Sequence, residues 1–125
     1  MNQKILIIDD EAHIRLLLER TLIDFEDEGV EILTAENGEA GLALIQTEKP
    51  ALVFLDVMMP KMNGFDVCHV VKNELKMDEV YIVMLTAKGQ EYDRQKGTDV
   101  GVDVYMTKPF DPDEIYDKVE EVLGL

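Results

Sequence analysis

Short apolar runs recur along the chain, and most are followed by a longer stretch with apolar residues at three- and four-residue spacing. Short runs are typical of strands buried on both faces, whereas the wider spacing is typical of amphipathic helices. The runs predict five strands: Lys4–Ile8, Val30–Ala35, Ala51–Leu55, Val80–Leu85 and Gly101–Met106. The chain is therefore expected to alternate strand and helix from end to end.

The first two predicted helices follow the first two strands. The stripe expected to face the core in the first helix comprises Ile14, Leu17, Leu18, Thr21 and Leu22. Asn37 is expected to cap the second helix, which runs to about Thr47 with Ala40, Ala43 and Leu44 facing inward. Pro50 ends it, because the residue before a proline disfavours helical backbone.

The last three predicted helices differ in how firmly they should be held. One opens at Asn63–Gly64, with Val67, Val70 and Val71 on its core face. The segment Gly89–Thr98 is mostly polar, so a helix there would have few apolar anchors. The final helix has Asp111 as N-cap, Pro112 in the first position and Glu114 completing a capping box. Its buried stripe is expected to be Ile115, Val119, Val122 and Leu123.

Five strand–helix units in succession predict an α/β fold in which a parallel sheet is covered by helices on both faces. Right-handed crossovers make such a sheet doubly wound. The alternation leaves the strand order open. With 125 residues and no linker or repeat, residues 1–125 are expected to form one domain.

The charge balance excludes some classes of partner. The chain has 12 basic and 27 acidic side chains and a net charge of −15. Nucleic-acid phosphates and anionic membranes would repel such a domain, so neither is expected as a direct partner. Cys68 is the one cysteine, no apolar run approaches the length of a membrane span, and the N-terminus does not resemble a signal peptide. A cytoplasmic location is therefore expected.

Chemically capable side chains follow the predicted strands at the points where these end. Asp9 and Asp10 follow the first strand, Asp56 the third and Thr86 the fourth, and Lys108 lies two residues past the fifth. The carboxyl ends of parallel strands meet at one edge of the sheet, where ligands bind in open α/β folds. These five residues are therefore expected to converge.

A convergent set of this kind suits phosphoryl transfer. Three carboxylates in one crevice repel one another, and Mg²⁺, which prefers oxygen ligands, would relieve the repulsion. A lysine and a threonine hydroxyl would then neutralise and hydrogen-bond a phosphoryl group. Taken singly, Asp9-Asp10 and Thr86 have an alternative interpretation as helix caps or turn residues.

Four motifs in order make the chain resemble the response-regulator receiver family. They are ILIIDDE at Ile5–Glu11, LVFLDVMMPKMNG at Leu52–Gly64, IVMLTAK at Ile82–Lys88 and YMTKPF at Tyr105–Phe110. The resemblance runs from Met1 to Leu125. It implies a flavodoxin-like fold with strand order 2-1-3-4-5.

The resemblance also implies a metal site. Asp10 and Asp56 would ligate Mg²⁺, or Mn²⁺ as a substitute, directly. Asp9 would act largely through water. The backbone carbonyl of Met58 would be a further ligand.

The remaining implied roles concern the phosphoryl group. Asp56 would be the phosphoacceptor, Lys108 would pair with the group, and Thr86 and the backbone of Ala87 would hydrogen-bond it. The Lys108-Pro109 bond would be cis. Thr86 and Tyr105 would act as the switch, although a half-buried strand aromatic is the plainer interpretation of Tyr105.

The function implied is signalling, not turnover of a separate substrate. A sensor histidine kinase or a phosphotransfer protein would phosphorylate Asp56, and the face made by the 89–98 helix, the fifth strand and the last helix would change its affinity for a partner. Output would come from a stand-alone regulator, a longer protein or a phosphorylation-dependent homodimer. Two residues, Met58 and Lys88, are expected to flank the path of attacking water.

Two alternatives to this function fit the residues less well. A haloacid-dehalogenase-like phosphatase would carry a second aspartate two residues after the nucleophile, where this chain has Met58, and would have a cap domain. A binding module that is never phosphorylated would have no need of all five residues. His13, His69 and Cys68 are expected to have no chemical role.

Overall fold

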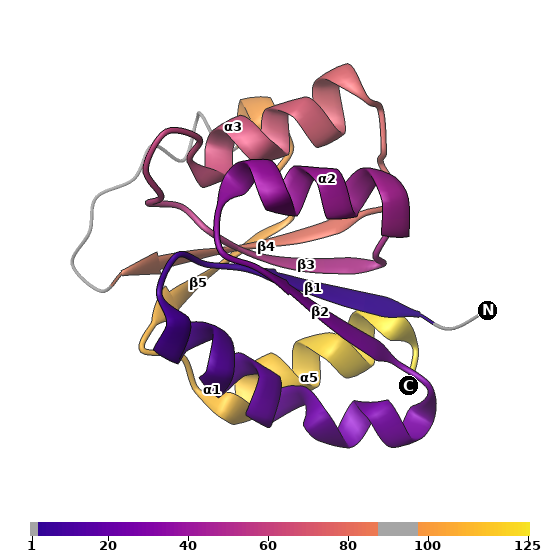
Figure 1. Ribbon diagram of the computed structural model, residues 1–125. Helices are drawn as coiled ribbons and strands as arrows, with labels where there is room; N and C mark the ends of the chain where they lie inside the picture. The colour runs from indigo at the N-terminus through magenta and orange to yellow at the C-terminus, as the bar shows by residue number, and fades with distance from the viewer. Residues whose placement is uncertain (1–2, 88–97) are drawn as a thin grey trace.

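A five-stranded parallel sheet runs through the middle of the molecule, with helices on both faces (Figure 1). The computed structural model describes residues 3–87 and 98–125. The strand order is β2-β1-β3-β4-β5, and every neighbouring pair is parallel. The doubly wound fold expected from the alternation, and the order implied by the resemblance, are both confirmed.

The five strands lie close to their predicted positions. They are β1 (Lys4–Ile8), β2 (Glu31–Ala35), β3 (Leu52–Asp56), β4 (Tyr81–Ala87) and β5 (Val104–Lys108). The prediction was least accurate for β5, which begins three residues later than expected. Gly101 has a φ of 92° and the Asp103 carboxylate accepts a hydrogen bond from Ile82 N, so this segment turns before the strand starts.

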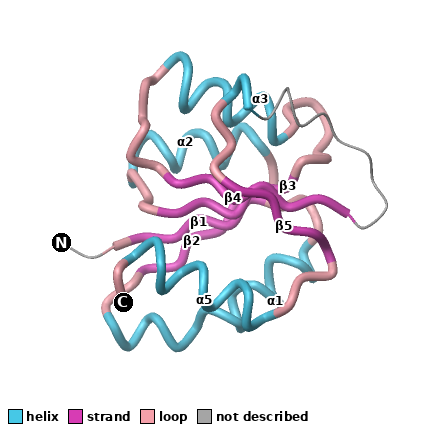
Figure 2. The backbone as a smooth tube through the Cα atoms, turned by 180° about the vertical axis from the view of Figure 1, so that it is seen from behind, coloured by secondary structure: helices cyan, strands magenta, loops and turns pink. Residues whose placement is uncertain are grey.

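Four α-helices are described, and two cover each face of the sheet. They are α1 (Ala12–Leu22), α2 (Gly38–Glu48), α3 (Gly64–His69) and α5 (Pro112–Leu123). Figures 1 and 2 show α2 and α3 on one side of the sheet and α1 and α5 on the other. A 3₁₀ turn at Ile23–Glu28 and a π-helical turn at Val70–Glu74 were not predicted. The helix predicted over Gly89–Thr98 lies, apart from Thr98, outside the described residues.

The helix ends follow the predicted capping residues with one exception. Asn37 accepts a hydrogen bond from Ala40 N, and Asp111 accepts one from Asp113 N. The capping box predicted for Asp111 and Glu114 is wrong, because the Asp111 carboxylate is used two residues ahead and Pro112 occupies the first turn. Within the described part of the chain, a capping box joins Asn63 and Asp66 at the start of α3 instead.

The predicted core face is confirmed for α1 at Leu18 and Leu22 but not at Leu17, and it is largely wrong for α2. Leu17 of α1 is 47% exposed, and in α2 both Ala40 and Ala43 are exposed. The inward stripe of α2 contains Gly38, Gly41 and Ile45 instead. A Cβ at Gly41 would lie 2.4 Å from Ile8 Cδ1, so the glycine lets α2 approach β1 closely. The stripe was assigned wrongly because alanines were counted as core residues and glycines were not.

The three central strands β1, β3 and β4 are buried on both faces, whereas the edge strands β2 and β5 are partly exposed. Alternate residues of β1 and β3 pack toward α2 and α3 (Leu6, Ile8, Val53, Leu55) or toward α1 and α5 (Ile5, Ile7, Leu52, Phe54). A slip of one residue would exchange the two sets, so the register is strongly determined. The carboxyl ends of β1, β3, β4 and β5 consequently meet at one edge.

Candidate functional site

All five predicted site residues lie at the carboxyl edge of the sheet, at the ends of the neighbouring strands β1, β3, β4 and β5. Asp9 follows β1 directly, Asp56 is the last residue of β3, and Thr86 lies next to last in β4. Asp56 stands opposite Leu85, and Ala87 stands opposite Lys108, the last residue of β5. Asp10 follows Asp9, so parallel pairing brings all five residues to one edge, as predicted.

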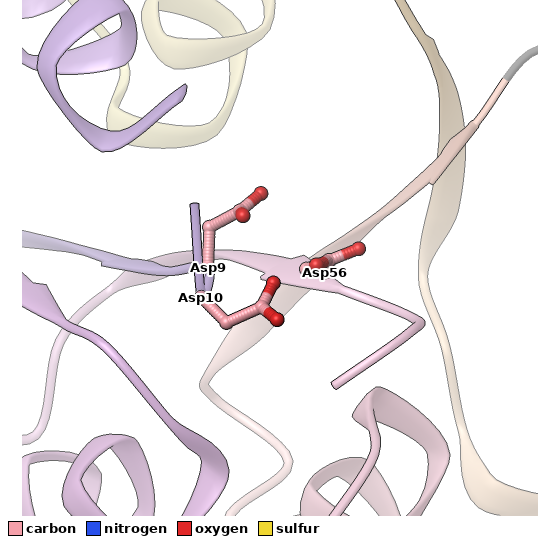
Figure 3. A group of neighbouring side chains, drawn as sticks. All are labelled: Asp9, Asp10 and Asp56. Carbon is pink, nitrogen blue, oxygen red and sulfur yellow. The ribbon is translucent and has the colours of Figure 1, made fainter. Parts of the chain in front are cut away.

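The three aspartates form a compact group of carboxylates (Figure 3). One oxygen from each of Asp9, Asp10 and Asp56 lies within 4.8 Å of the others. Asp9 and Asp56 are buried and Asp10 is exposed, and Figure 3 shows the Asp10 carboxylate turned towards Asp56. Three oxygen donors at this separation, one of them open to solvent, suit a hard divalent cation. The group could therefore hold a metal ion.

Asp9 is bonded at every polar atom. Its backbone N donates to Ala35 O at 3.2 Å, and its backbone O accepts from Arg15 Nη1 at 2.7 Å. Its carboxylate accepts from Glu11 N at 2.9 Å and from Lys108 Nζ at 2.7 Å. A fully buried carboxylate requires hydrogen-bond partners, and Asp9 has them. The water-mediated role of Asp9 toward a metal, which the resemblance implied, stays a prediction.

Lys108 lies between the two buried carboxylates. Its Nζ is 2.7 Å from Asp9 Oδ2, 3.3 Å from Asp56 Oδ1 and 3.9 Å from Glu11 Oε1. Burial acts to lower the pKa of Lys108, but the hydrogen bond to Asp9 and the charges of Asp56 and Asp9 outweigh it, so the pKa is raised. Lys108 is therefore a permanent cation at this edge. The Lys108-Pro109 bond is cis, as the resemblance implied.

Asp56 is the carboxylate that burial affects most. Burial raises the pKa of Asp56 to about 7; the charge of Asp9 adds to the effect, and Lys108 and the Met58 N–H oppose it. The Met58 N–H donates to Asp56 Oδ1 at 3.3 Å. Without a metal ion beside it, this carboxylate would titrate near neutrality even with Lys108 in place. A divalent ion would favour its charged form, which is the form that can attack phosphorus.

The loop after β3 is held close against Asp56. Gly64 N donates to Val57 O, and a Cβ at Gly64 would lie 2.5 Å from Asp56 O. Only glycine permits this approach without moving the backbone. The Met58 side chain on this loop is 62% exposed, and its carbonyl as a metal ligand stays a prediction.

The predicted switch residues differ in their surroundings. Thr86 is buried at the end of β4. Tyr105 of β5 is half-buried and packs against the core on the α2–α3 side of the sheet. Ala87 is exposed at the end of β4, and Lys88 lies outside the described residues. Their roles toward a phosphoryl group stay predictions.

Sequence reasoning overlooked the contributions of Arg15 and Glu11. Both contact Asp9 from the first turn of α1 or just before it. One sequence signal could have indicated this contact: Arg15 follows Glu11 by four residues, so the two lie one helical turn apart, close to the paired aspartates. His13 and His69 are exposed and Cys68 is buried, as predicted.

Comparison with known proteins gives a consistent result. Residues 5–120 match the model of the response regulator receiver domain. The chain is 45% identical over 123 residues to the alkaline phosphatase synthesis transcriptional regulatory protein PhoP of Bacillus subtilis, covering 98% of this chain and 49% of that protein. It is 40% identical to the phosphate regulon transcriptional regulatory protein PhoB of Pseudomonas aeruginosa, covering 98% of this chain and 52% of that protein.

Solved structures agree with the sequence relatives. The Vibrio cholerae chemotaxis protein CheY4 superposes with a TM-score of 0.83 at 31% identity, covering 98% of this chain and 99% of that one. A response regulator from Chloroflexus aurantiacus gives a TM-score of 0.84 at 30% identity, with both chains fully covered.

Two limits on the function follow from these findings. The chain spans about half the length of the curated relatives it matches. None of the matches reported above supports the haloacid-dehalogenase-like alternative.

The structure also bears on membrane insertion. Among residues 3–87 and 98–125, no helix has both the length and the apolar character needed to cross a bilayer.

Proposed function

Because this chain belongs to the response-regulator receiver family, we propose that Asp56 accepts a phosphoryl group from a sensor histidine kinase or a histidine phosphotransfer protein. One observation carries the proposal, the position of Asp56 at the end of a central strand, where its side chain is buried. Lys108 Nζ lies 3.3 Å from Asp56 Oδ1, and carboxylate oxygens of Asp9 and Asp10 lie beside it. A nucleophile, a fixed cation and a metal-binding group are the parts that phosphoryl transfer needs.

In the transfer step, a carboxylate oxygen of Asp56 attacks phosphorus as the bond to the donor imidazole nitrogen breaks. The electron pair of that bond stays on the nitrogen, and the O–P bond of an aspartyl phosphate forms. Lys108 already faces Asp56, so its positive charge offsets charge on the phosphoryl oxygens. The Thr86 hydroxyl and the Ala87 backbone N–H, at the adjacent end of β4, would donate hydrogen bonds to the same oxygens.

A divalent cation completes this arrangement. Asp10, Asp56 and the Met58 carbonyl would hold Mg²⁺, or Mn²⁺ in its place, with Asp9 acting through water, and the ion would supply further positive charge beside the phosphoryl group. Asp10 is exposed, so it can meet the ion without desolvation of a buried group. The chain's own chemistry would be limited to accepting the phosphoryl group and later losing it to water.

The output would pass through the face that β5 and α5 contribute. Thr86 would move toward the phosphoryl group and Tyr105 would turn inward behind it. The carboxyl part of this face carries the exposed acids Asp113, Asp117 and Glu121 around Lys118. A downstream protein, an effector domain in the same polypeptide or a second phosphorylated copy would bind there. The cytoplasm, where such kinases deliver phosphoryl groups, is the proposed location.

Intact mass tests the acceptor assignment. The wild type, Asp56→Asn and the matched control Asp117→Asn would each be incubated with acetyl phosphate and Mg²⁺. One phosphoryl adduct is expected on the wild type and on Asp117→Asn, and none on Asp56→Asn or in the presence of a chelator. An adduct that persists in Asp56→Asn would refute the acceptor assignment. No adduct on any protein would refute it too, if fluoroberyllate, a stable phosphoryl mimic, also failed to bind the wild type.

A further inference from the structure

The exposed carboxylate of the metal-binding group is held only through its neighbours. Within the described residues, no hydrogen bond reaches the side chain of Asp10. Its direction in Figure 3, toward Asp56, therefore depends on its rotamer and on the position of the backbone that carries it. That backbone connects Asp9, which is fully buried, with Glu11 at the start of α1.

Three hydrogen bonds close a ring around Asp10. Arg15 Nη1 donates to Asp9 O at 2.7 Å, and Arg15 N donates to Glu11 O at 3.2 Å. Glu11 N donates to Asp9 Oδ1 at 2.9 Å. Arg15 contributes two of the three bonds, one from its side chain and one from its backbone. Its guanidinium is the only side-chain group in the described residues that bonds the Asp9 carbonyl.

We propose that Arg15 is a positioning residue that holds the backbone around Asp10 so that its carboxylate faces Asp56 and the cation between them. The proposal rests on the proposed function, since it assumes a cation bound by Asp10 and Asp56. Arg15 touches neither the cation nor the phosphoryl group, and acts through the Asp9 carbonyl. Groups that orient metal ligands in this way typically affect metal affinity about tenfold or more.

A second effect of Arg15 has the opposite sign, which makes the proposal testable. The guanidinium is a positive charge near three carboxylates, and a charge of that sign repels a divalent cation. If charge alone mattered, removal of Arg15 would tighten Mg²⁺ binding. If positioning matters, removal would weaken it. The sign of the change therefore separates the two roles.

The experiment is a Mg²⁺ titration by calorimetry of wild type, Arg15→Met and Arg15→Lys, with Arg20→Met as the matched control. Arg20 lies on the same helix, is exposed and forms no hydrogen bond or ion pair within the described residues. Arg15→Met is expected to bind Mg²⁺ about tenfold more weakly. Arg15→Lys keeps a donor and the charge, and is expected to recover most of the affinity, while Arg20→Met matches the wild type.

Phosphorylation by acetyl phosphate supplies a second readout. In Arg15→Met, the Mg²⁺ concentration that gives half the maximal rate is expected to rise by the same factor as the dissociation constant, with the maximal rate near that of wild type. If Arg15→Met does not fold, Arg15→Gln, which is shorter and loses the charge, takes its place and is expected to bind Mg²⁺ more weakly than wild type.

Three outcomes would overturn the proposal: tighter Mg²⁺ binding in the charge-free variant, unchanged binding, or equal weakening in Arg15→Met and Arg15→Lys. A merely structural role would lower thermal stability without changing the Mg²⁺ dissociation constant of the folded protein. Failure of the proposed function looks different, because the wild type and Arg20→Met would then fail to bind Mg²⁺ as well.

Discussion

The two ends of the sheet differ in the balance of their positive and negative side chains. At the carboxyl ends, the carboxyl-edge cluster of Asp9, Asp10, Asp56 and Lys108 places three carboxylates around one lysine. At the amino ends of β4 and β5, an amino-edge network joins Lys72 to Asp103 at 3.3 Å, one cation to one anion. The first cluster has excess negative charge and the second has none.

The amino-edge network and the carboxyl-edge cluster also differ in their hydrogen-bond partners within the protein. Lys72 Nζ also donates to the carbonyl oxygens of Asp78 and Val80, and Asp103 accepts from Ile82 N. The network thus ties the π-helical turn after α3 to the starts of β4 and β5. Asp56 and Asp10 have no comparable set of partners among the described residues. The amino edge is satisfied within the protein, and the carboxylates of the carboxyl edge could hold a metal ion.

The largest expected effect comes from disrupting the satisfied end. Lys72→Met would leave Asp103 without its cation and two carbonyl groups without a donor, and the Lys72 side chain is only 9% exposed. Asp103 is partly open to solvent, so most of the effect is expected from the two lost hydrogen bonds of a charged donor, and the free energy of unfolding should fall by about 3 kcal/mol. Urea unfolding of Lys72→Met would measure it. Lys76→Met, which changes an exposed lysine nearby, is the control, and equal losses in both variants would contradict the assignment.

The opposite change is expected at the carboxyl edge, where removal of a charge should stabilise the metal-free protein. Burial raises the pKa of Asp56 from 3.8 to about 7, so the folded protein retains a proton that the unfolded chain releases. The wild type therefore loses stability from this group as the pH rises from about 4 to about 7. Asn at position 56 is neutral throughout, so the stability advantage of Asp56→Asn should grow over this range and level off above it.

The size of this advantage is limited by solvent screening. The pKa of Asp56 already includes the effect of Lys108, and the full shift corresponds to roughly 4 kcal/mol. About 2 kcal/mol is expected, because solvent and relaxation of the folded protein screen part of the cost of the buried charge. Urea unfolding with a chelator at about pH 5 and about pH 8 would measure it, with Asp117→Asn as control. Mg²⁺ should stabilise the wild type more than the variant. An advantage for Asp56→Asn that shrinks as the pH rises would contradict the sign of the pKa shift.

The sequence predicted the carboxyl edge better than the amino edge for a physical reason. Asp9, Asp56 and Lys108 lie where buried strands end, and parallel pairing brings those ends together whatever the details of packing. Lys72 and Asp103 are 31 residues apart, and nothing in their surroundings marks them as partners. Their contact depends on the π-helical turn and on the left-handed Gly101, which periodicity does not reveal.

Errors in the predicted helix faces have a related cause. The spacing placed Leu17 and Ala40 in the core, but helix rotation is decided by which residues permit the closest approach to the sheet. Gly41 decides it for α2, through its contact with Ile8. Arg15 was overlooked because its side chain reaches back across the end of β1, and only the three-dimensional structure shows where a long side chain ends.

The smallest expected effect concerns the solvent side of the carboxyl-edge cluster, where Met58 is 62% exposed beside Asp56. Its backbone N–H contacts Asp56, but its apolar side chain can neither orient nor activate an attacking water. Met58→Asn would add groups that can hold a water by one hydrogen bond, which is worth about 0.7 kcal/mol or roughly threefold in the rate of aspartyl phosphate hydrolysis. Decay of the phosphorylated protein, followed by intact mass, would measure this rate, with the exposed Leu75→Asn as control. Slower decay in Met58→Asn would mean that Met58 assists the attack of water. The few hydrogen-bond partners of Asp56 would then leave it open to an attacking water as well as to a cation.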